Sequence, residues 1–280
     1  MKAIGTALLV GLAAAPAVSA YDMMTSRGAG MGRTLVFSRP AASALVNLPA
    51  AGLAPGGWHI EGGYNRRFEL ADLDQLYLAA AYRVRSFTLA LGASQFGRTD
   101  LYAEQLIKGS VGVSRGRVTA GASLSALQVQ IGDGYGGLRA ATLGASVALR
   151  WPRFHLGLSG DNLTRPRLFE YSLPSEPQFA LYGEFEGGGS YSITGRVTWE
   201  RLQSPQFAFG QLIRLSPRGD FFWGVAFNPL EYGGGIEVNV LSGSIGYAAS
   251  VHPVLGVTHT VSFSYGSKSA RPKSKEPEEF

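Results

Sequence analysis

The sequence predicts an all-β fold, a transmembrane antiparallel up-and-down β-barrel of about 14 strands with an N-terminal plug segment. Three observations predict it. Segments of alternating polarity recur from residue 57 onward, and the linkers between them alternate between long and short. Charged residues make up only 16% of the chain, against roughly 25% in an average soluble domain. Outer-membrane barrels have strands of about 10 residues, short periplasmic turns and longer extracellular loops.

Residues 1–20 are predicted to be a secretory signal peptide. Lys2 precedes an apolar run to Ala15, and small residues at 18–20 form a cleavage site. No later apolar run approaches the roughly 20 residues that a transmembrane helix needs. The chain contains no cysteine, which excludes disulfide and thiol chemistry. Two exported folds fit these features: a barrel in the outer membrane of a Gram-negative bacterium, and a soluble periplasmic β-sandwich.

The mature chain divides into three parts. Residues 21–56 form the N-terminal plug or periplasmic segment, residues 57–266 form the barrel, and residues 267–280 form a polar tail that we expect to be disordered. Fourteen strands are predicted, at 57–66, 74–84, 86–94, 102–114, 117–131, 139–151, 153–160, 177–186, 189–200, 205–215, 219–228, 232–241, 243–251 and 256–266.

The last predicted strand, GVTHTVSFSYG, illustrates the alternation. Because side chains alternate between the two faces of a strand, one face is mostly apolar and the other carries only hydroxyl groups. In a sandwich the apolar face would point to a core, and in a barrel it would point to lipid. The low charge of the second faces, which are rich in glycine and serine, favours lipid. Aromatic residues also gather near strand ends, as they do in membrane-interface girdles.

This register predicts two sets of site residues. The lipid-facing set is Leu89, Leu91, Val147, Leu156, Leu158, Ile193, Val197, Ile236, Val238, Val261 and Phe263. The lumen-facing charged set is Glu61, Glu104, Lys108, Arg150, Glu184, Arg196, Glu200, Arg214 and Glu237. These charges either pair and hold a plug or line a polar path, and we favour pairing because buried charges need partners. We also expect Val147→Arg to cost roughly 2–4 kcal/mol and Ser146→Arg to be tolerated far better.

The N-terminal segment resembles the opening of the PorV/PorQ-like outer-membrane proteins, which are similar in architecture to the FadL transporters. A Gly-x-Gly-Met-Gly element is matched by Gly28, Gly30, Met31 and Gly32. An Asn-Pro-Ala-Gly-Leu-Ala element is matched loosely, with Leu48 inserted, by Asn47, Pro49, Ala50, Gly52 and Leu53. Further family elements are matched at Tyr102 and Glu104, at Gly157 to Leu163, and at Gly256, Thr258 and His259.

The resemblance implies a fourteen-stranded barrel whose N-terminal segment folds into the lumen. It implies either of two functions. The leading prediction is a non-enzymatic binding or scaffold barrel of an envelope export system, with an envelope protein partner on its long loops. The alternative is a FadL-like passive transporter of small hydrophobic molecules. As partners we expect outer-membrane lipid and the barrel-assembly machinery.

Other functions have little support in the sequence. Gly112 to Gly116 fits Gly-x-Ser-x-Gly, but no helix pattern follows it, so we interpret it as a hairpin turn rather than a hydrolase elbow. The four histidines have no acidic or histidine companion at metal-ligand spacing. The cations are scattered, which argues against nucleic acid despite the net charge of +5. We therefore expect no catalytic residue, no metal and no cofactor.

Overall fold

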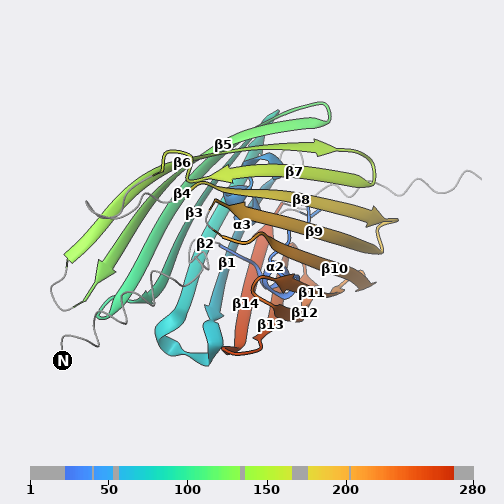
Figure 1. The fold of residues 1–280 in the computed structure, drawn as a ribbon. Helices are drawn as coiled ribbons and strands as arrows, with labels where there is room; N and C mark the ends of the chain where they lie inside the picture. The colour runs from blue at the N-terminus through green and yellow to red at the C-terminus, as the bar shows by residue number, and fades with distance from the viewer. Residues whose placement is uncertain are drawn as a thin grey trace, which may run out of the picture.

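The structure is a computed structural model that describes residues 23–39, 41–52, 57–132, 136–165, 176–201 and 203–267. The strands of these ranges are β1 (Trp58–Arg66), β2 (Asp74–Val84), β3 (Phe87–Arg98), β4 (Tyr102–Arg115), β5 (Val118–Ile131), β6 (Gly136–Arg150), β7 (Phe154–Asp161), β8 (Gln178–Gly187), β9 (Tyr191–Glu200), β10 (Gln206–Ser216), β11 (Gly219–Phe227), β12 (Glu231–Val240), β13 (Gly243–His252) and β14 (Gly256–Gly266). Each strand pairs antiparallel with its neighbours in sequence, and β1 pairs with β14, so the sheet closes (Figure 1). The predicted barrel is confirmed, and the sandwich alternative is wrong.

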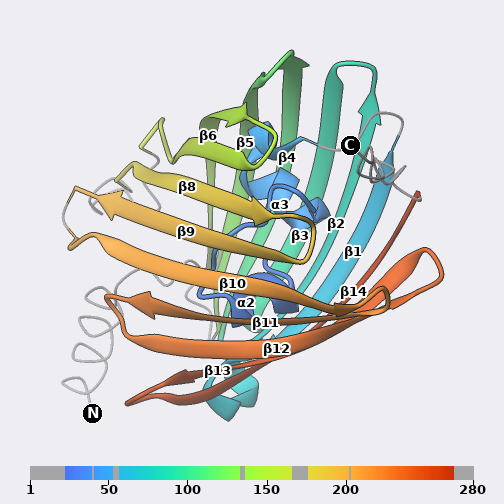
Figure 2. The ribbon, with the colours of Figure 1, turned by 90° about the vertical axis from the view of Figure 1, so that its right-hand side faces the viewer.

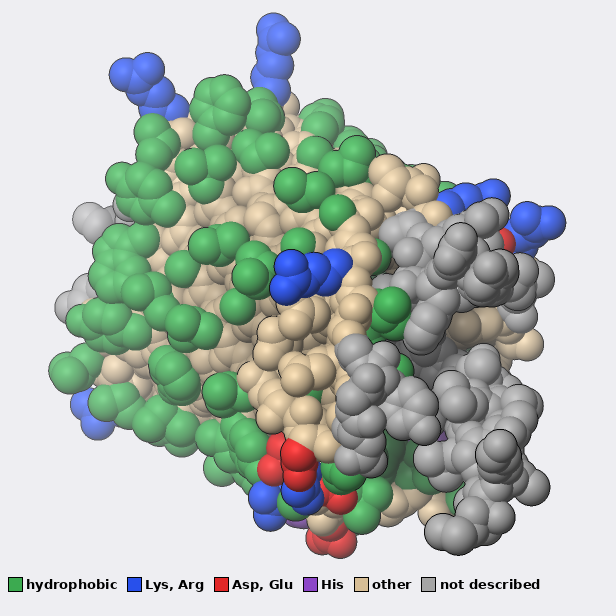
Figure 3. All heavy atoms as spheres, turned by 90° about the vertical axis from the view of Figure 1, so that its left-hand side faces the viewer, with side chains coloured by type: hydrophobic (Ala, Val, Ile, Leu, Met, Phe, Trp, Pro, Cys, Tyr) green, Lys and Arg blue, Asp and Glu red, His purple; other side chains and the backbone are tan. Residues whose placement is uncertain are grey.

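The apolar face of each strand points outward. On β14, Thr260 and Ser262 are 1% and 5% exposed, whereas Val261 and Phe263 are 45% and 53% exposed. The same inside-to-outside order holds around the ring, and apolar side chains cover much of the outer face seen in Figure 3. Soluble proteins rarely expose a continuous apolar surface of this extent, because contact between apolar side chains and water is unfavourable. The band therefore indicates a nonaqueous environment around the barrel. The apolar face of GVTHTVSFSYG therefore lies on the outside of the barrel.

The linkers divide the barrel into two ends. At the turn end, the connections β2–β3, β4–β5, β6–β7, β8–β9, β10–β11 and β12–β13 are short, for example residues 85–86 and 217–218. At the loop end, residues 67–73 join β1 to β2 and contain two 3-10 helices, η2 (Arg67–Glu69) and η3 (Ala71–Leu73). Residues 162–177 join β7 to β8, with 166–175 outside the described residues. Gly112 to Gly116 closes β4 in a tight hairpin turn to β5.

The N-terminal segment lies inside the barrel (Figure 2). It contains two short helices, α2 (Ser26–Gly30) and α3 (Ala42–Asn47), and the 3-10 helix η1 (Pro49–Ala51). Thr25 caps α2 by accepting a hydrogen bond from the Gly28 amide at 2.9 Å, and proline begins η1 where its missing N–H costs nothing. α2 packs against β11 to β14, α3 against β1 to β4, and η1 against β3 to β6.

In the described ranges, no helix is both long enough and apolar enough to cross a membrane.

Two apolar clusters join this segment to the wall. The larger contains Leu45, Val46 and Leu48, and the smaller contains Met31 with Phe222. Glycines of the wall permit the close approach. A Cβ at Gly112 would lie 2.4 Å from the Pro49 carbonyl oxygen, and a Cβ at Gly224 would lie 2.4 Å from the Met31 carbonyl carbon. Backbone therefore packs on backbone, which only glycine allows here. The inward glycines make room for the segment.

Candidate functional site

Two buried glutamates of the wall bind serines of the N-terminal segment. Ser43 Oγ donates a hydrogen bond to Glu61 Oε1 at 2.7 Å, and the Tyr77 hydroxyl donates to the same oxygen at 2.8 Å. On the opposite side of the lumen, the Ser38 amide and hydroxyl donate to the two oxygens of Glu184 at 2.9 and 2.6 Å. Hydrogen bonds to carboxylates are about twice as strong as neutral ones, so these contacts hold the segment at two separate points.

Two arginines of the segment form ion pairs with the wall. Arg27 in α2 binds Glu237 of β12 and donates from Nη1 to the Arg39 carbonyl at 3.2 Å. Arg39 Nη1 lies 2.6 Å from Asp220 Oδ2, and Arg214 Nε lies 3.9 Å from the other Asp220 oxygen. Burial lowers the pKa of Arg27, but the carboxylates of Glu237 and Asp220 raise it by more, so the pKa ends above its usual value and the guanidinium stays charged.

Basic residues of the wall bind the backbone of the segment. Arg150 Nη2 donates to the Gly52 carbonyl at 2.9 Å, near the turn end. Arg196 Nη1 donates to the Arg33 carbonyl at 3.2 Å, closer to the loop end. These two contacts cap the chain where it leaves helical structure and its carbonyls have no internal partner. Acidic and basic side chains of the wall therefore both bind the N-terminal segment.

Hydroxyl groups supply further contacts. The Ser26 and Ser262 hydroxyls lie 2.8 Å apart, and the Ser26 amide donates to the same Ser262 oxygen at 3.0 Å. The Thr34 and Thr194 hydroxyls lie 2.6 Å apart. None of these residues was singled out from the sequence. Their inward register was predictable from the alternation, but their partners were not.

Ser146 corrects one expectation. Its hydroxyl accepts a hydrogen bond from the Ala50 amide at 3.0 Å, and the residue is 9% exposed beneath η1. An arginine at this inward position would meet the N-terminal segment, so we now expect Ser146→Arg to be destabilising as well. A lumen-facing position is tolerant only where the segment leaves open space.

The other predicted lumen-facing charges are Glu104, Lys108 and Glu200. Glu104 accepts a hydrogen bond from the Tyr102 hydroxyl, and Lys108 Nζ lies 2.7 Å from Asp161 Oδ1. Glu200 ends β9 with its side chain on the inward register. These groups do not contact the N-terminal segment in the interactions described above. Glu104 and Glu200 lie near the loop end of their strands, whereas Lys108 is buried near the middle of β4.

The predicted plug residues are mostly buried. Those within the buried class are Gly28, Gly30, Met31, Gly32, Pro49 and Gly52. Asn47 is half-buried, and its amide donates to the Met23 carbonyl at 2.9 Å. Leu53 lies outside the described residues, as do the predicted signal peptide and residues 268–280.

The predicted lipid-facing residues occupy the outward register of their strands. Those that are exposed are Leu89, Leu91, Val147, Leu156, Leu158, Ile236, Val238, Val261 and Phe263. Ile193 and Val197 on β9 are half-buried between larger neighbours such as Trp199 and Phe207. Aromatic pairs mark the ends of the band, including Trp58 with Tyr265 at 5.5 Å between ring centroids.

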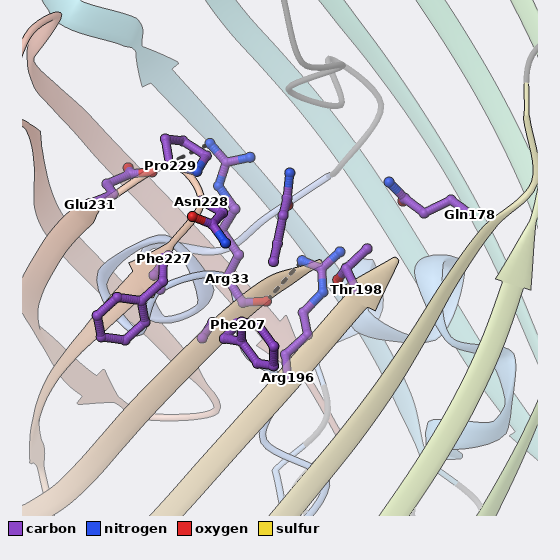
Figure 4. A pocket seen from close by; sticks show the side chains of 13 residues that line it. Arg33, Gln178, Arg196, Thr198, Phe207, Phe227, Asn228, Pro229 and Glu231 are labelled. Carbon is purple, nitrogen blue, oxygen red and sulfur yellow. Dashed lines mark hydrogen bonds and ion pairs between the residues drawn. The ribbon is translucent and has the colours of Figure 1, made fainter. Parts of the chain in front are cut away.

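A recess of about 550 Å³, including its open mouth, lies beside the segment near the loop end. Figure 4 shows Arg33, Arg196 and Thr198 around it, with Glu231 on the far side. Arg33 Nη2 lies 3.7 Å from Glu231 Oε2. Apart from Arg196, these lining residues were not predicted. The described residues contain no group of His, Asp and Glu side chains that could hold a metal ion.

No protein-family model and no curated protein matches the chain. Solved structures do resemble it. The Ralstonia pickettii toluene transporter TbuX matches with a TM-score of 0.62 and 12% identity, over 88% of this chain and 97% of that one. The Pseudomonas putida toluene transporter TodX matches with a TM-score of 0.62 and 10% identity, over 87% and 97%. The Acinetobacter baumannii outer membrane protein Omp33 matches with a TM-score of 0.50 and 10% identity, over 74% and 96%.

At these identities the comparison concerns the fold. The chain has the fold of FadL-like outer-membrane barrels, which confirms that part of the resemblance. The narrower likeness to PorV and PorQ has no counterpart among these structures. None of the three is described as an enzyme.

Proposed function

We propose that this protein is an outer-membrane channel of a Gram-negative bacterium that admits small hydrophobic molecules. The observation that carries the proposal is the fold shared with two toluene transporters over 88% and 87% of the chain. The exposed apolar band supports a membrane location, because only lipid would cover a surface that encircles the molecule. In this setting the loop end faces the cell exterior and the turn end faces the periplasm.

The character of the lumen supports a hydrophobic cargo. Glu61, Glu184 and Glu237 bind the N-terminal segment, so these charges do not line a path for ions. Besides its polar contacts, the segment meets the wall through the apolar side chains of two clusters. A polar solute would lose hydration at such contacts, whereas an aromatic or aliphatic molecule would not.

Uptake of labelled toluene by cells that produce the protein tests the proposal. We expect faster uptake than in cells with an empty vector. Ala226→Trp places a large ring in the recess and should reduce uptake, whereas Val238→Trp places the same ring on the outer face and should not. If cells that produce the wild-type protein take up toluene no faster than empty-vector cells, the proposed cargo is refuted. If Ala226→Trp leaves uptake as fast as in the wild type, the hydrophobic molecule does not enter through the recess.

The scaffold function that led the sequence-based predictions has less support. It rested on the PorV/PorQ resemblance, whereas two of the solved structures that share this fold are toluene transporters. An envelope protein partner on the long loops stays a prediction. Co-purification from outer-membrane extracts would test it independently of uptake.

A further inference from the structure

The turn end of the barrel is cationic. Its six short turns cover residues 85–86, 116–117, 151–153, 188–190, 217–218 and 241–242, and none contains Asp or Glu. Arginines occupy four of them, and one more ends β4. These are Arg85, Arg115, Arg117, Arg153 and Arg218. All five are exposed, and within the described residues none forms an ion pair.

Four of these arginines form one continuous arc. Arg85 lies in the β2–β3 turn, Arg115 and Arg117 in the β4–β5 turn, and Arg153 in the β6–β7 turn. These turns are successive along the rim because β2 to β7 are consecutive strands of the closed sheet. We call these four residues the arginine arc. In Figure 3, basic side chains project beyond the edge of the apolar outer face.

The arc lies at the depth of lipid headgroups. Arg85 is two residues from Phe87, and Arg153 lies between Trp151 and Phe154, all of which are exposed aromatic residues. Aromatic rings of this kind mark the membrane–water interface. The guanidinium groups one or two residues beyond them therefore reach the phosphate layer, and their long side chains can extend into it.

The loop end differs from the turn end. There Arg66 pairs with Asp74, and Arg98 lies between Asp72 and Asp100. These two loop-end arginines thus have carboxylate partners close by. Arg139, near the loop-end start of β6, donates to Gln128 instead, so among the described residues the exposed arginines without an ion pair are concentrated at the turn end.

We propose that the arginine arc binds the phosphate groups of anionic phospholipids in the membrane leaflet at the turn end. A guanidinium matches a phosphate through two parallel hydrogen bonds, which suits arginine better than lysine. Four such groups along one rim present several sites to neighbouring lipids, and among the described residues none of the four is ion-paired with a carboxylate. The lipid would fix the vertical position and tilt of the barrel.

The test measures lipid retention by the purified full-length protein. The protein is exchanged into detergent with equal amounts of phosphatidylglycerol and phosphatidylcholine, and bound lipids are counted by native mass spectrometry. We expect the wild type to prefer phosphatidylglycerol by at least about ten-fold, since each arginine near an anionic surface contributes to attraction. A variant with Arg85→Gln, Arg115→Gln, Arg117→Gln and Arg153→Gln should lose this preference.

The matched control removes four charges from the loop end, as Arg98→Gln, Arg139→Gln, Arg165→Gln and Arg201→Gln, and should keep the preference. Replacing the arc by four lysines should keep part of it. If the wild-type protein binds phosphatidylglycerol and phosphatidylcholine equally, the proposal is overturned. This holds even if the arginine arc binds an acidic protein. If the loop-end control loses the preference for phosphatidylglycerol to the same extent as the arc variant, the proposal is also overturned.

A gel shift between boiled and unboiled samples establishes that each variant forms a closed barrel. If the fourfold variant does not fold, Arg115→Gln with Arg117→Gln in a single turn should halve the preference, and no change there overturns the proposal. The outcome is independent of toluene uptake.

Discussion

The buried pair between Arg27 and Glu237 offers the sharpest test of how the N-terminal segment is held. Both side chains are nearly buried, at 14% and 7% exposure. Removing one partner of such a pair typically costs about 3–5 kcal/mol, because the other charge stays buried without compensation. Replacing both by apolar residues of similar size is often nearly neutral. We therefore expect Glu237→Met to loosen α2 strongly, and Arg27→Met with Glu237→Met to loosen it little.

Hydrogen–deuterium exchange of the α2 amides measures this loosening. The Ala29 and Met31 amides donate to the Thr25 and Arg27 carbonyls at 2.9 and 3.0 Å, so they are protected while the helix stays docked. At about 1.4 kcal/mol per tenfold change, 3–5 kcal/mol corresponds to exchange faster by about 140- to 4,000-fold. Amides of β13 serve as the internal reference for an intact barrel. Exchange in Glu237→Met within a few-fold of wild type would refute the reasoning.

Further predictions concern the barrel wall. Val147→Arg should lower the free energy of unfolding in lipid vesicles by about 2–4 kcal/mol and Leu149→Arg by about 0–1, because Val147 lies deeper below the interface; equal costs would contradict the assigned depth. Gly112→Ala should destabilise the protein in urea by about 1–3 kcal/mol, since its Cβ would meet the Pro49 carbonyl oxygen at 2.4 Å. Gly109→Ala on the same strand, whose nearest neighbour lies 4.0 Å away, should change stability by less than about 0.5 kcal/mol, and a similar loss at both sites would count against the packing described. The unboiled protein should migrate differently from the boiled protein in a detergent gel, and identical mobility would contradict a closed barrel.

The strands were predictable because their signal is local. Alternation of side chains and turn residues identified every strand of the described barrel, and most bounds agree within a few residues. The larger differences are at the loop end. β3 continues to Arg98 where the prediction ended at 94, and β6 begins at Gly136 where the prediction began at 139. Outward positions there are polar, such as Gln95 and Arg139, so the alternation fades although the backbone pairing continues.

The wall residues of the candidate site were predictable from the sequence, but their partners in the N-terminal segment were not. The period of two placed Glu61, Glu184 and Glu237 toward the lumen, but their partners come from a segment with no strand pattern. α2 and α3 are 5 and 6 residues long, too short for a helical period to emerge. Arg27 and Glu237 are 210 residues apart, so their contact depends on closure of the whole ring. Asp220 was missed although the predicted strand 219–228 carries it on the inward register.

Closure of the sheet by β1 and β14 determines the order in which the molecule can be built. The N-terminal segment is synthesised first, yet Ser26 and Arg27 bind Ser262 and Glu237 near the end of the chain. These contacts cannot form until the last strands have been delivered to the membrane. The segment contacts strands on both sides of the seam between β1 and β14, so its full set of contacts exists only once that seam has joined. The final strand therefore completes the wall and its contents together, and non-local contacts of this kind make folding slow.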